Sequence, residues 1–211
     1  MNESIITKYF SDFTPEQLKQ FAALGDLYKD WNSKINVISR KDIDNIYEHH
    51  ILHSLAIAVF IEFKAGTKII DLGTGGGFPG IPLAIMFPEA QFHLVDGTRK
   101  KIKVVQEVAD AINLKNLKAE HIRAEEVKAR QYDFVVCRAV AQLPQLWIWS
   151  ERLLRDRQTN VIPNGLIALK GGAVDKEIKA LPRGSYTDKE EISNFFEEEY
   201  YKEKYIVYVQ Y

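Results

Sequence analysis

The spacing of apolar residues along the chain predicts helices first and strands afterwards, with the change near Gly66. Thr14 can cap a helix, Pro15 suits its first turn, and Gln17 can complete a capping box. Apolar side chains then recur at helical spacing. A second helix is expected over residues 42–63. Together these segments predict a helical N-terminal cap over residues 1–64.

Beyond Gly66, short apolar runs alternate with helical patterns. The expected elements are strand 68–72, helix 78–86, strand 91–95, helix 100–112, strands 118–122 and 133–136, helix 141–154, and strands 166–169, 192–196 and 205–209. Strands and helices that alternate in this way predict an α/β fold, in which a mostly parallel sheet carries helices on both faces. We expect residues 65–211 to form this core and the cap to pack on it as one unit.

Composition narrows the class of protein without naming an activity. The chain is 46% hydrophobic and 27% charged, which is typical of a globular protein, and its net charge of −1 gives no global basic field. No apolar run reaches the ~20 residues of a membrane helix, and the first residues lack the pattern of a signal peptide. The single cysteine, Cys137, excludes an internal disulfide and a cysteine-cluster metal site. A cytoplasmic protein that does not bind membranes is therefore expected.

Charge is uneven along the chain, although the total is nearly balanced. Basic residues exceed acidic ones over residues 99–138, and acidic residues exceed basic ones over residues 184–204. This distribution is a weak indication of a surface that faces a polyanion, but ordinary solvated helix faces give the same pattern.

The stretch DLGTGGGFPG, residues 71–80, carries the clearest chemical signal. A glycine-rich turn between the first strand and first helix of such a sheet binds a nucleotide-like cofactor. Residues 75–80 match the dinucleotide pattern G-x-G-x-x-G, whereas residues 71–77 match acid-x-G-x-G-x-G, a pattern of S-adenosylmethionine (SAM) sites.

The chemistry of the two ligands favours SAM. A dinucleotide places its pyrophosphate on free N–H groups at the helix start, and Pro79 offers none. SAM carries an ammonium and a sulfonium, which suit the carboxylate of Asp71 directly or through water. Gly73, Gly75 and Gly77 are expected to let the backbone lie against its methionine and ribose portions. Another nucleotide and a ligand-free turn stay as alternatives.

Asp96 directly follows the second expected strand. A carboxylate there can accept hydrogen bonds from both ribose hydroxyls of a bound nucleoside. NAD enzymes share this feature with SAM enzymes, so Asp96 supports a nucleoside without choosing between them. A surface acid in a turn is the alternative.

Several further motifs accompany the glycine loop in a fixed order. They are Trp31-Asn32 with Asn36-Val37-Ile38, His50-Ile51-Leu52-His53-Ser54-Leu55, Asp96 with Lys100-Lys101, Arg123-Ala124-Glu125-Glu126, and Arg138-Ala139. With DLGTGGGFPGIPLAI, they resemble the bacterial 16S rRNA methyltransferase G family, also called glucose-inhibited division protein B. The resemblance runs from about Trp31 to Gly171. His53 stands where the family usually has Asp, and Gly97 where Ser is common.

The resemblance implies a Rossmann-like class I SAM-dependent methyltransferase that acts on N7 of a guanine in 16S rRNA, at position 527 in the 530 loop. The expected partner is 16S rRNA or the 30S subunit, and the enzyme is expected to be a monomer. By the same resemblance, the residues expected to contact SAM are Gly73, Phe78, Ala124, Glu125 and Arg138.

Each of these positions has a structural alternative. Arg138 could form an internal ion pair instead of holding a carboxylate or orienting the target nucleotide. Phe78 could be a core residue, and Ala124-Glu125 could form a simple helix cap.

Guanine N7 has a free lone pair, so its methylation needs orientation more than a catalytic base. We therefore expect no catalytic residue in the strict sense. Arg138, His50 and Asn32 are the candidates for positioning, with loop capping as the alternative for Asn32. Asn36, Lys100 and Lys101 are candidates for RNA binding, where lysines would position the backbone without reading sequence.

Other chemistries fit less well. The fourth strand ends without the N/D-P-P-Y/F motif of enzymes that methylate exocyclic amines, and Cys137 lacks the Pro-Cys context of cytosine-C5 enzymes. His49 and His53 share a helical face but have no evident third ligand, so no metal is expected. A methyltransferase acting on a protein or small molecule, a non-catalytic SAM-binding ribosome assembly factor, and an NAD-binding oxidoreductase stay as alternatives.

Overall fold

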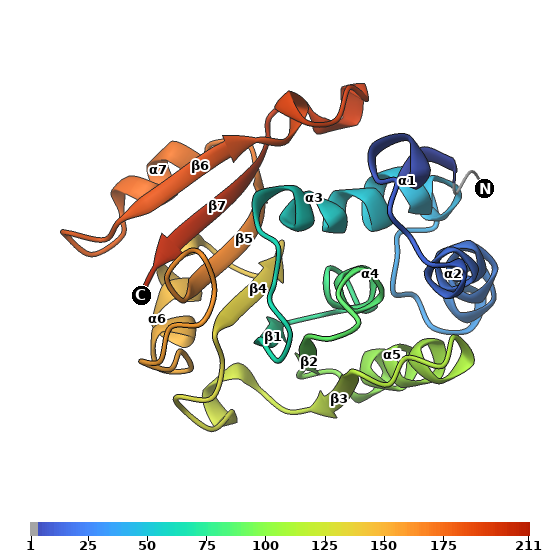
Figure 1. Ribbon diagram of the computed structural model, residues 1–211, viewed down its shortest axis with the longest axis horizontal. Helices are drawn as coiled ribbons and strands as arrows, with labels where there is room; N and C mark the ends of the chain where they lie inside the picture. The colour runs from blue at the N-terminus through green and yellow to red at the C-terminus, as the bar shows by residue number, and fades with distance from the viewer. Residues whose placement is uncertain (1–3) are drawn as a thin grey trace.

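Seven strands form a single sheet in the order β3-β2-β1-β4-β5-β7-β6 in the computed structural model, which describes residues 4–211 (Figure 1). The strands are β1 (Lys68–Leu72), β2 (Gln91–Asp96), β3 (Leu117–His121), β4 (Phe134–Arg138), β5 (Gly165–Gly171), β6 (Thr187–Glu191) and β7 (Lys204–Gln210). Strands β1 to β5 are parallel, and β7 runs antiparallel to both β5 and β6. This arrangement confirms the expected α/β class and the mostly parallel sheet.

Helices cover both faces of the sheet (Figure 1). They are α1 (Ser4–Tyr9), α2 (Pro15–Lys34), α3 (His53–Phe60), α4 (Gly80–Met86), α5 (Arg99–Ala111), α6 (Leu143–Glu151) and α7 (Val174–Lys179). Helices α3, α4 and α5 lie on one face with α1 and α2 outside them, and α6 and α7 lie on the other. Within residues 4–211, no helix is both long and apolar enough to cross a bilayer.

The predicted start of α2 is confirmed in detail. The hydroxyl of Thr14 accepts a 3.2 Å hydrogen bond from the backbone N–H of Gln17, and the side chain of Gln17 accepts one of 2.9 Å from the backbone of Thr14. The amide of Gln17 also donates to the carbonyl of Ile85, and Gln20 donates to the carbonyl of Ile112. The capping residues therefore also anchor α2 to the ends of α4 and α5.

The second segment of the cap differs from the single helix expected over residues 42–63. A 3-10 turn (Ile43–Asn45) leads into a π-helical stretch (Ile46–Leu52), and a regular α-helix, α3, begins only at His53. Wider π-helical turns are rare and frequently occur at functional sites. This stretch presents His49 and His50 to the end of β4, as described below.

The strand expected over residues 192–196 is wrong, because that strand lies earlier, at β6. Its sequence, TDKEE, is polar throughout, which suits an edge strand that must not pair with other chains. Ile192 and Phe196 are fully buried because a 3-10 turn (Ile192–Asn194) directs them into the core. The two short helices α1 and α7 were not expected from the pattern.

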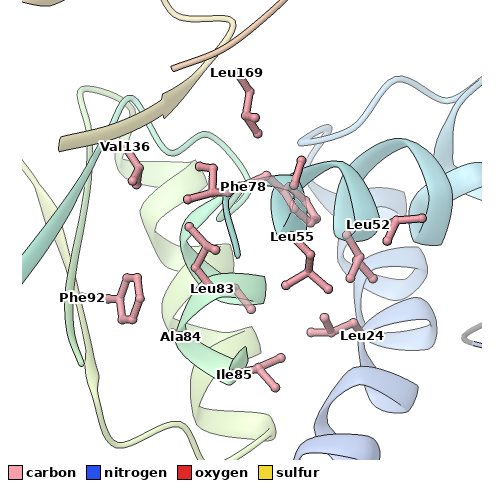
Figure 2. Packing of buried hydrophobic residues seen from close by; sticks show 14 of the residues in the cluster. Leu24, Leu52, Leu55, Phe78, Leu83, Ala84, Ile85, Phe92, Val136 and Leu169 are labelled. Atoms are coloured by element: carbon pink, nitrogen blue, oxygen red, sulfur yellow. The ribbon is translucent and has the colours of Figure 1, made fainter. Parts of the chain in front are cut away.

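The cap and the sheet share one hydrophobic core. Buried residues from α2, α3, α4, β2 and β5 belong to the same cluster, including Leu24, Leu55, Leu83, Phe92 and Leu169 (Figure 2). A second cluster lies under α6 and α7 on the other face. Helices α2 and α3 of the cap pack against α4, and Tyr28 of α2 contacts the glycine loop that leads into α4.

Candidate functional site

The candidate site lies where the carboxyl ends of β1, β2 and β4 meet. Strand β1 pairs with β2 on one side and with β4 on the other, so the direction of strand order changes at β1. Ligands of open α/β sheets bind outside the carboxyl ends of the strands at such a switch point. The glycine loop, residues 73–79, follows β1 directly and occupies this place.

Asp71 lies beneath the glycine loop, fully buried, and holds the loop closed. Its Oδ2 accepts a 2.6 Å hydrogen bond from the hydroxyl of Thr74 and a 2.9 Å bond from the N–H of Gly80. Burial raises the pKa of Asp71 to about 7, against the opposing effect of these two donors. Asp71 was expected to meet SAM directly or through water, and its full burial disfavours the direct contact. Only Oδ1, which has no hydrogen-bond partner among residues 4–211, is left to face a ligand or a water.

The glycines of the loop serve two different purposes. Gly75 has a φ of +58°, and a Cβ added there would meet nothing closer than 4.0 Å. Gly77, with a φ of +101°, is crowded, because an added Cβ would lie 2.6 Å from Ile81 and 2.9 Å from the hydroxyl of Tyr28. Gly75 is therefore a position where a ligand can approach the backbone, whereas Gly77 is required by the protein's own packing.

Gly73 also touches the protein rather than open space. Its φ is +68°, and an added Cβ would lie 2.8 Å from the side chain of Val140, which follows β4. Contacts within the protein are therefore enough to require glycine at positions 73 and 77, and the contact of these backbones with a ligand stays a prediction.

Asp96 ties the end of β2 to the loop. Its Oδ2 accepts a 3.0 Å hydrogen bond from the N–H of Gly75, and its Oδ1 accepts a 2.7 Å bond from the N–H of Thr98. The carboxylate is half-buried and keeps lone pairs for further donors.

Arg138 ends β4 and is held by the cap. One terminal nitrogen donates to the carbonyl of His49 at 3.2 Å, and the other donates to Nδ1 of His50 at 2.8 Å. The guanidinium lies 5.1 Å from the ring centre of Phe78, a cation–π contact. The structure therefore brings together three of the candidates from the sequence, Arg138, His50 and Phe78.

His50 is fixed between Arg138 and Asp42. Because Nδ1 accepts from Arg138, Nε2 carries the proton and donates to Asp42 at 2.5 Å. Burial, and then the nearby charge of Arg138, lower the pKa of His50 to about 4, so the ring is neutral at pH 7. Asp42 also lies 2.5 Å from Nδ1 of His49. The carboxylate thus orients both histidines.

Phe78 is enclosed rather than open to a ligand. It is 3% exposed, and its ring lies 4.8 Å from that of Tyr28 and 5.3 Å from that of His50. The structure therefore favours the core alternative for Phe78, and Arg138 rather than a cofactor covers its ring. Figure 2 shows Phe78 at the upper part of the core, between α3 and the end of the sheet.

Asn32 does not reach the site. Its side chain donates to the carbonyl of Ile38 at 2.9 Å and accepts from the N–H groups of Val37 and Ile38, so both ends of its amide hold the turn after α2. The positioning role predicted for Asn32 is corrected to loop capping. Asn36, in the same turn, is exposed.

The remaining candidates lie at the surface around the loop. Lys100 is exposed and Lys101 half-buried in the first turn of α5. Ala124 and Glu125 form a 3-10 turn (Ala124–Glu126) after β3, where Glu125 is exposed and the carbonyl of Ala124 accepts a short hydrogen bond from Arg152. Each of these positions follows the carboxyl end of β2 or β3, the edge of the sheet at which the site lies.

Several site residues were missed by the sequence analysis. Tyr28, fully buried on α2, donates a 2.5 Å hydrogen bond from its hydroxyl to the carbonyl of Gly76. Thr74 and Asp42 hold the loop and the histidines. The position of Asp42, eight residues before His50, was a weak indication that the two side chains could pair. The sequence spacing gave no indication that Tyr28 contacts Gly76. Within the part of the chain that the structure describes, no group of three potential ligands is arranged around a metal.

Comparison with solved structures shows the fold. A SAM-dependent methyltransferase from Aquifex aeolicus superposes with a TM-score of 0.54 at 13% identity, over 74% of this chain and 88% of that chain. A mutant of MtNAS in complex with S-adenosylmethionine gives a TM-score of 0.59 at 10% identity, over 92% of this chain and 76% of that chain. The fold is therefore the Rossmann-like class I fold of SAM-dependent methyltransferases.

Comparison of sequences shows the family. The profile described as rRNA small subunit methyltransferase G matches residues 16–204. A protein of Bacteroides thetaiotaomicron named ribosomal RNA small subunit methyltransferase G is 58% identical over 98% of both chains, and one of Cytophaga hutchinsonii with the same name is 53% identical over 97% of this chain and 98% of its own. Both matches extend far beyond the glycine loop. The chain belongs to the rRNA small subunit methyltransferase G family.

Proposed function

We propose that this protein transfers a methyl group from SAM to N7 of a guanine in 16S rRNA, at position 527 in the 530 loop. The observation that supports this most strongly is that the family's motifs converge at one place. The glycine loop, Asp96 and Arg138 meet at the switch point of the sheet, and the cap adds His50.

The residues around the loop fit SAM. Gly75 leaves open space beside its backbone, the neighbouring carboxylate of Asp96 can accept the ribose hydroxyls, and Oδ1 of Asp71 is a buried acceptor without a partner in the described chain. Gly73, Ala124, Glu125 and Arg138 are carried over from the family as further contacts, whereas Phe78 is enclosed and supports the site from the core. When bound, SAM supplies an electrophilic methyl group on a sulfonium. An acceptor-rich, glycine-lined end of the sheet suits these cationic and hydroxyl groups.

Methyl transfer to N7 then requires mainly that the guanine be oriented toward the methyl group of SAM. The N7 lone pair forms the new carbon–nitrogen bond as the carbon–sulfur bond breaks, and the positive charge passes from sulfur to the base. No proton leaves, so no general base is needed. His50 stays neutral beside Arg138. A second positive charge is therefore not placed near the guanine ring, which becomes positively charged during the transfer. Cys137 is 1% exposed and burial raises its pKa, so a covalent route through its thiol is disfavoured.

The proposed RNA partner and the cellular compartment follow from this activity. Lys100 and Asn36 are exposed and Lys101 is half-buried, and we propose that these three residues contact the phosphate backbone. We propose the 30S subunit or 16S rRNA as substrate and a monomeric enzyme without a membrane partner. Because ribosomal subunits are its substrate, the protein acts in the cytoplasm.

The test is to incubate the protein with labelled SAM and 30S subunits from cells that lack this methylation, and then to digest the rRNA to nucleosides. Label in 7-methylguanosine supports the proposal, and the modified position is then mapped. SAM binding without transfer to RNA would contradict it and would favour a protein, a small molecule or a non-catalytic assembly role.

A further inference from the structure

A cavity of about 340 Å³ lies beside the proposed SAM site, on the other side of Arg138. It is formed by the cap, the ends of β4 and β5, and the segment that leads from β6 into β7. Its volume lies within the range of small-molecule sites, roughly 300–1,000 Å³. The polar residues that line it and matter here are His49, His50, His53, Arg138, Tyr200 and Lys204.

His53 is the unusual member of this wall. It is 6% exposed, and neither ring nitrogen makes a hydrogen bond of good geometry among residues 4–211, although the backbone of His49 interacts weakly with the ring. Burial lowers its pKa well below the usual range, so the ring is neutral, with one N–H donor and one acceptor. A buried polar group without a partner costs free energy, and such groups in native structures call for an explanation. A ligand that enters the cavity would supply the missing partner.

The rest of the wall offers hydrogen-bond donors. Arg138 has no acceptor atom, and the ammonium of Lys204 lies 3.9 Å from the ring centre of Tyr200 at the same cavity. No Asp or Glu belongs to the lining. A ligand for this cavity should therefore present acceptors to Arg138 and Lys204, and it can carry negative charge at the mouth. His53 supplies a neutral side-chain acceptor in the wall.

A guanine nucleotide matches this order of groups. Around the base, the N7 that receives the methyl is followed by O6, an acceptor, and then by N1–H, a donor. In the site, Arg138 lies over Phe78 next to the glycine loop, and His53, the first residue of α3, lies edge-on to Tyr200 at 5.8 Å and Tyr201 at 6.0 Å. Adenine would present an amine beside N7 and a bare N1, the reverse pattern.

We propose that His53 recognises the target base: its unprotonated ring nitrogen accepts the N1–H of the guanine, while Arg138 donates to O6. This inference rests on the proposed function, because it assumes that the base in the cavity is the guanine to be methylated. It makes His53 a specificity-determining residue that contacts the substrate.

The test compares His53→Phe, which keeps the ring size but removes both nitrogens, with His53→Asp, which restores an acceptor. Each variant and the wild-type protein are assayed for the SAM dissociation constant, for Tm, and for kcat/KM on 30S subunits that lack the methylation. We expect His53→Phe to lose about tenfold or more in kcat/KM. Its SAM affinity should stay unchanged, and its Tm should stay equal or rise because two unpaired nitrogens are gone. His53→Asp should recover most of the lost kcat/KM.

Two results would overturn the inference: wild-type kcat/KM in His53→Phe, or equal losses in both variants together with a lower Tm, which would indicate a structural role. Failure of the proposed function looks different. In that case the wild-type protein itself forms no 7-methylguanosine, whatever residue stands at position 53.

Discussion

The hydroxyl of Tyr28 donates a 2.5 Å hydrogen bond to the carbonyl of Gly76, and so joins the N-terminal cap to the middle of the glycine loop. Tyr28 is fully buried, and burial raises the pKa of its hydroxyl, which keeps the group a donor at any physiological pH. The cap therefore takes part in shaping the loop that is proposed to bind SAM.

Removing this hydroxyl should loosen the loop. Tyr28→Phe leaves the buried carbonyl of Gly76 without its donor, which costs roughly 1–3 kcal/mol of unfolding free energy. SAM affinity, measured by calorimetry, should fall as well because the loop is no longer fixed. Tyr208→Phe is the matched control, since its hydroxyl donates to the carbonyl of Pro163 away from the loop. Equal SAM affinity in the two variants would show that the contact only stabilises the fold.

Asp71→Asn should change how stability depends on pH. Burial raises the pKa of Asp71 to about 7 in the folded protein, above its unfolded value of about 4. Between these values the folded state binds more protons, so the contribution of Asp71 to stability is largest below pH 4 and is lost as pH rises towards 7. Asparagine cannot titrate and removes this contribution to the slope.

The measurement is the unfolding free energy of both proteins from pH 4 to pH 8. The difference between them isolates Asp71 from His50, whose lowered pKa acts in the opposite direction because its stabilising neutral form is lost as pH falls. A difference that does not vary with pH would show that Asp71 titrates normally.

Asp96→Ala should weaken SAM binding by ~1.5–3 kcal/mol, because it removes charge-assisted hydrogen bonds to the ribose. It also removes the acceptor for the N–H groups of Gly75 and Thr98. The control is Asp110→Ala, which removes an exposed acid from the last turn of α5. SAM affinity that matches the control would contradict the ribose assignment.

Cys137→Ala should keep its methyl transfer. The thiol is fully enclosed in the core beneath the end of β4, and burial raises its pKa, so no thiolate is available to attack a base. Stability should drop by about 1 kcal/mol because a small buried group is lost. An inactive but folded variant would revive covalent catalysis.

The sequence predicted those parts of the fold that the regular spacing of hydrophobic residues specifies by itself. The bounds of β1 and β2 and the cap of α2 agree with the structure to within a residue, because buried parallel strands and a capping box have strong local signals. The edge strand β6 was misplaced, because its polar residues show no hydrophobic alternation.

The site was predicted as a set of residues but not as a set of contacts. Asp71 and Asp96 were both identified, yet Asp71 turns inward to Thr74 and Gly80 while Asp96 reaches the loop. Asn32 stands in a matching motif but caps a turn. Sequence spacing predicts which strand end a residue occupies, and the packing of distant segments decides which way its side chain points.

The carboxylate of Asp42 orients His50, which in turn accepts from Arg138, so a change at Asp42 should reach the end of β4. Asp42→Asn keeps the size of the side chain, but one of the two histidines loses its acceptor because the new amide group is a donor. We expect about a tenfold slower methyl transfer in single-turnover assays, the effect of roughly 1.4 kcal/mol, with SAM affinity nearly unchanged. Asp44→Asn, an exposed acid in the same segment, is the control. If both variants transfer methyl at the wild-type rate, Arg138 does not depend on His50 for its position, and the hydrogen-bonded chain from Asp42 only stabilises the cap.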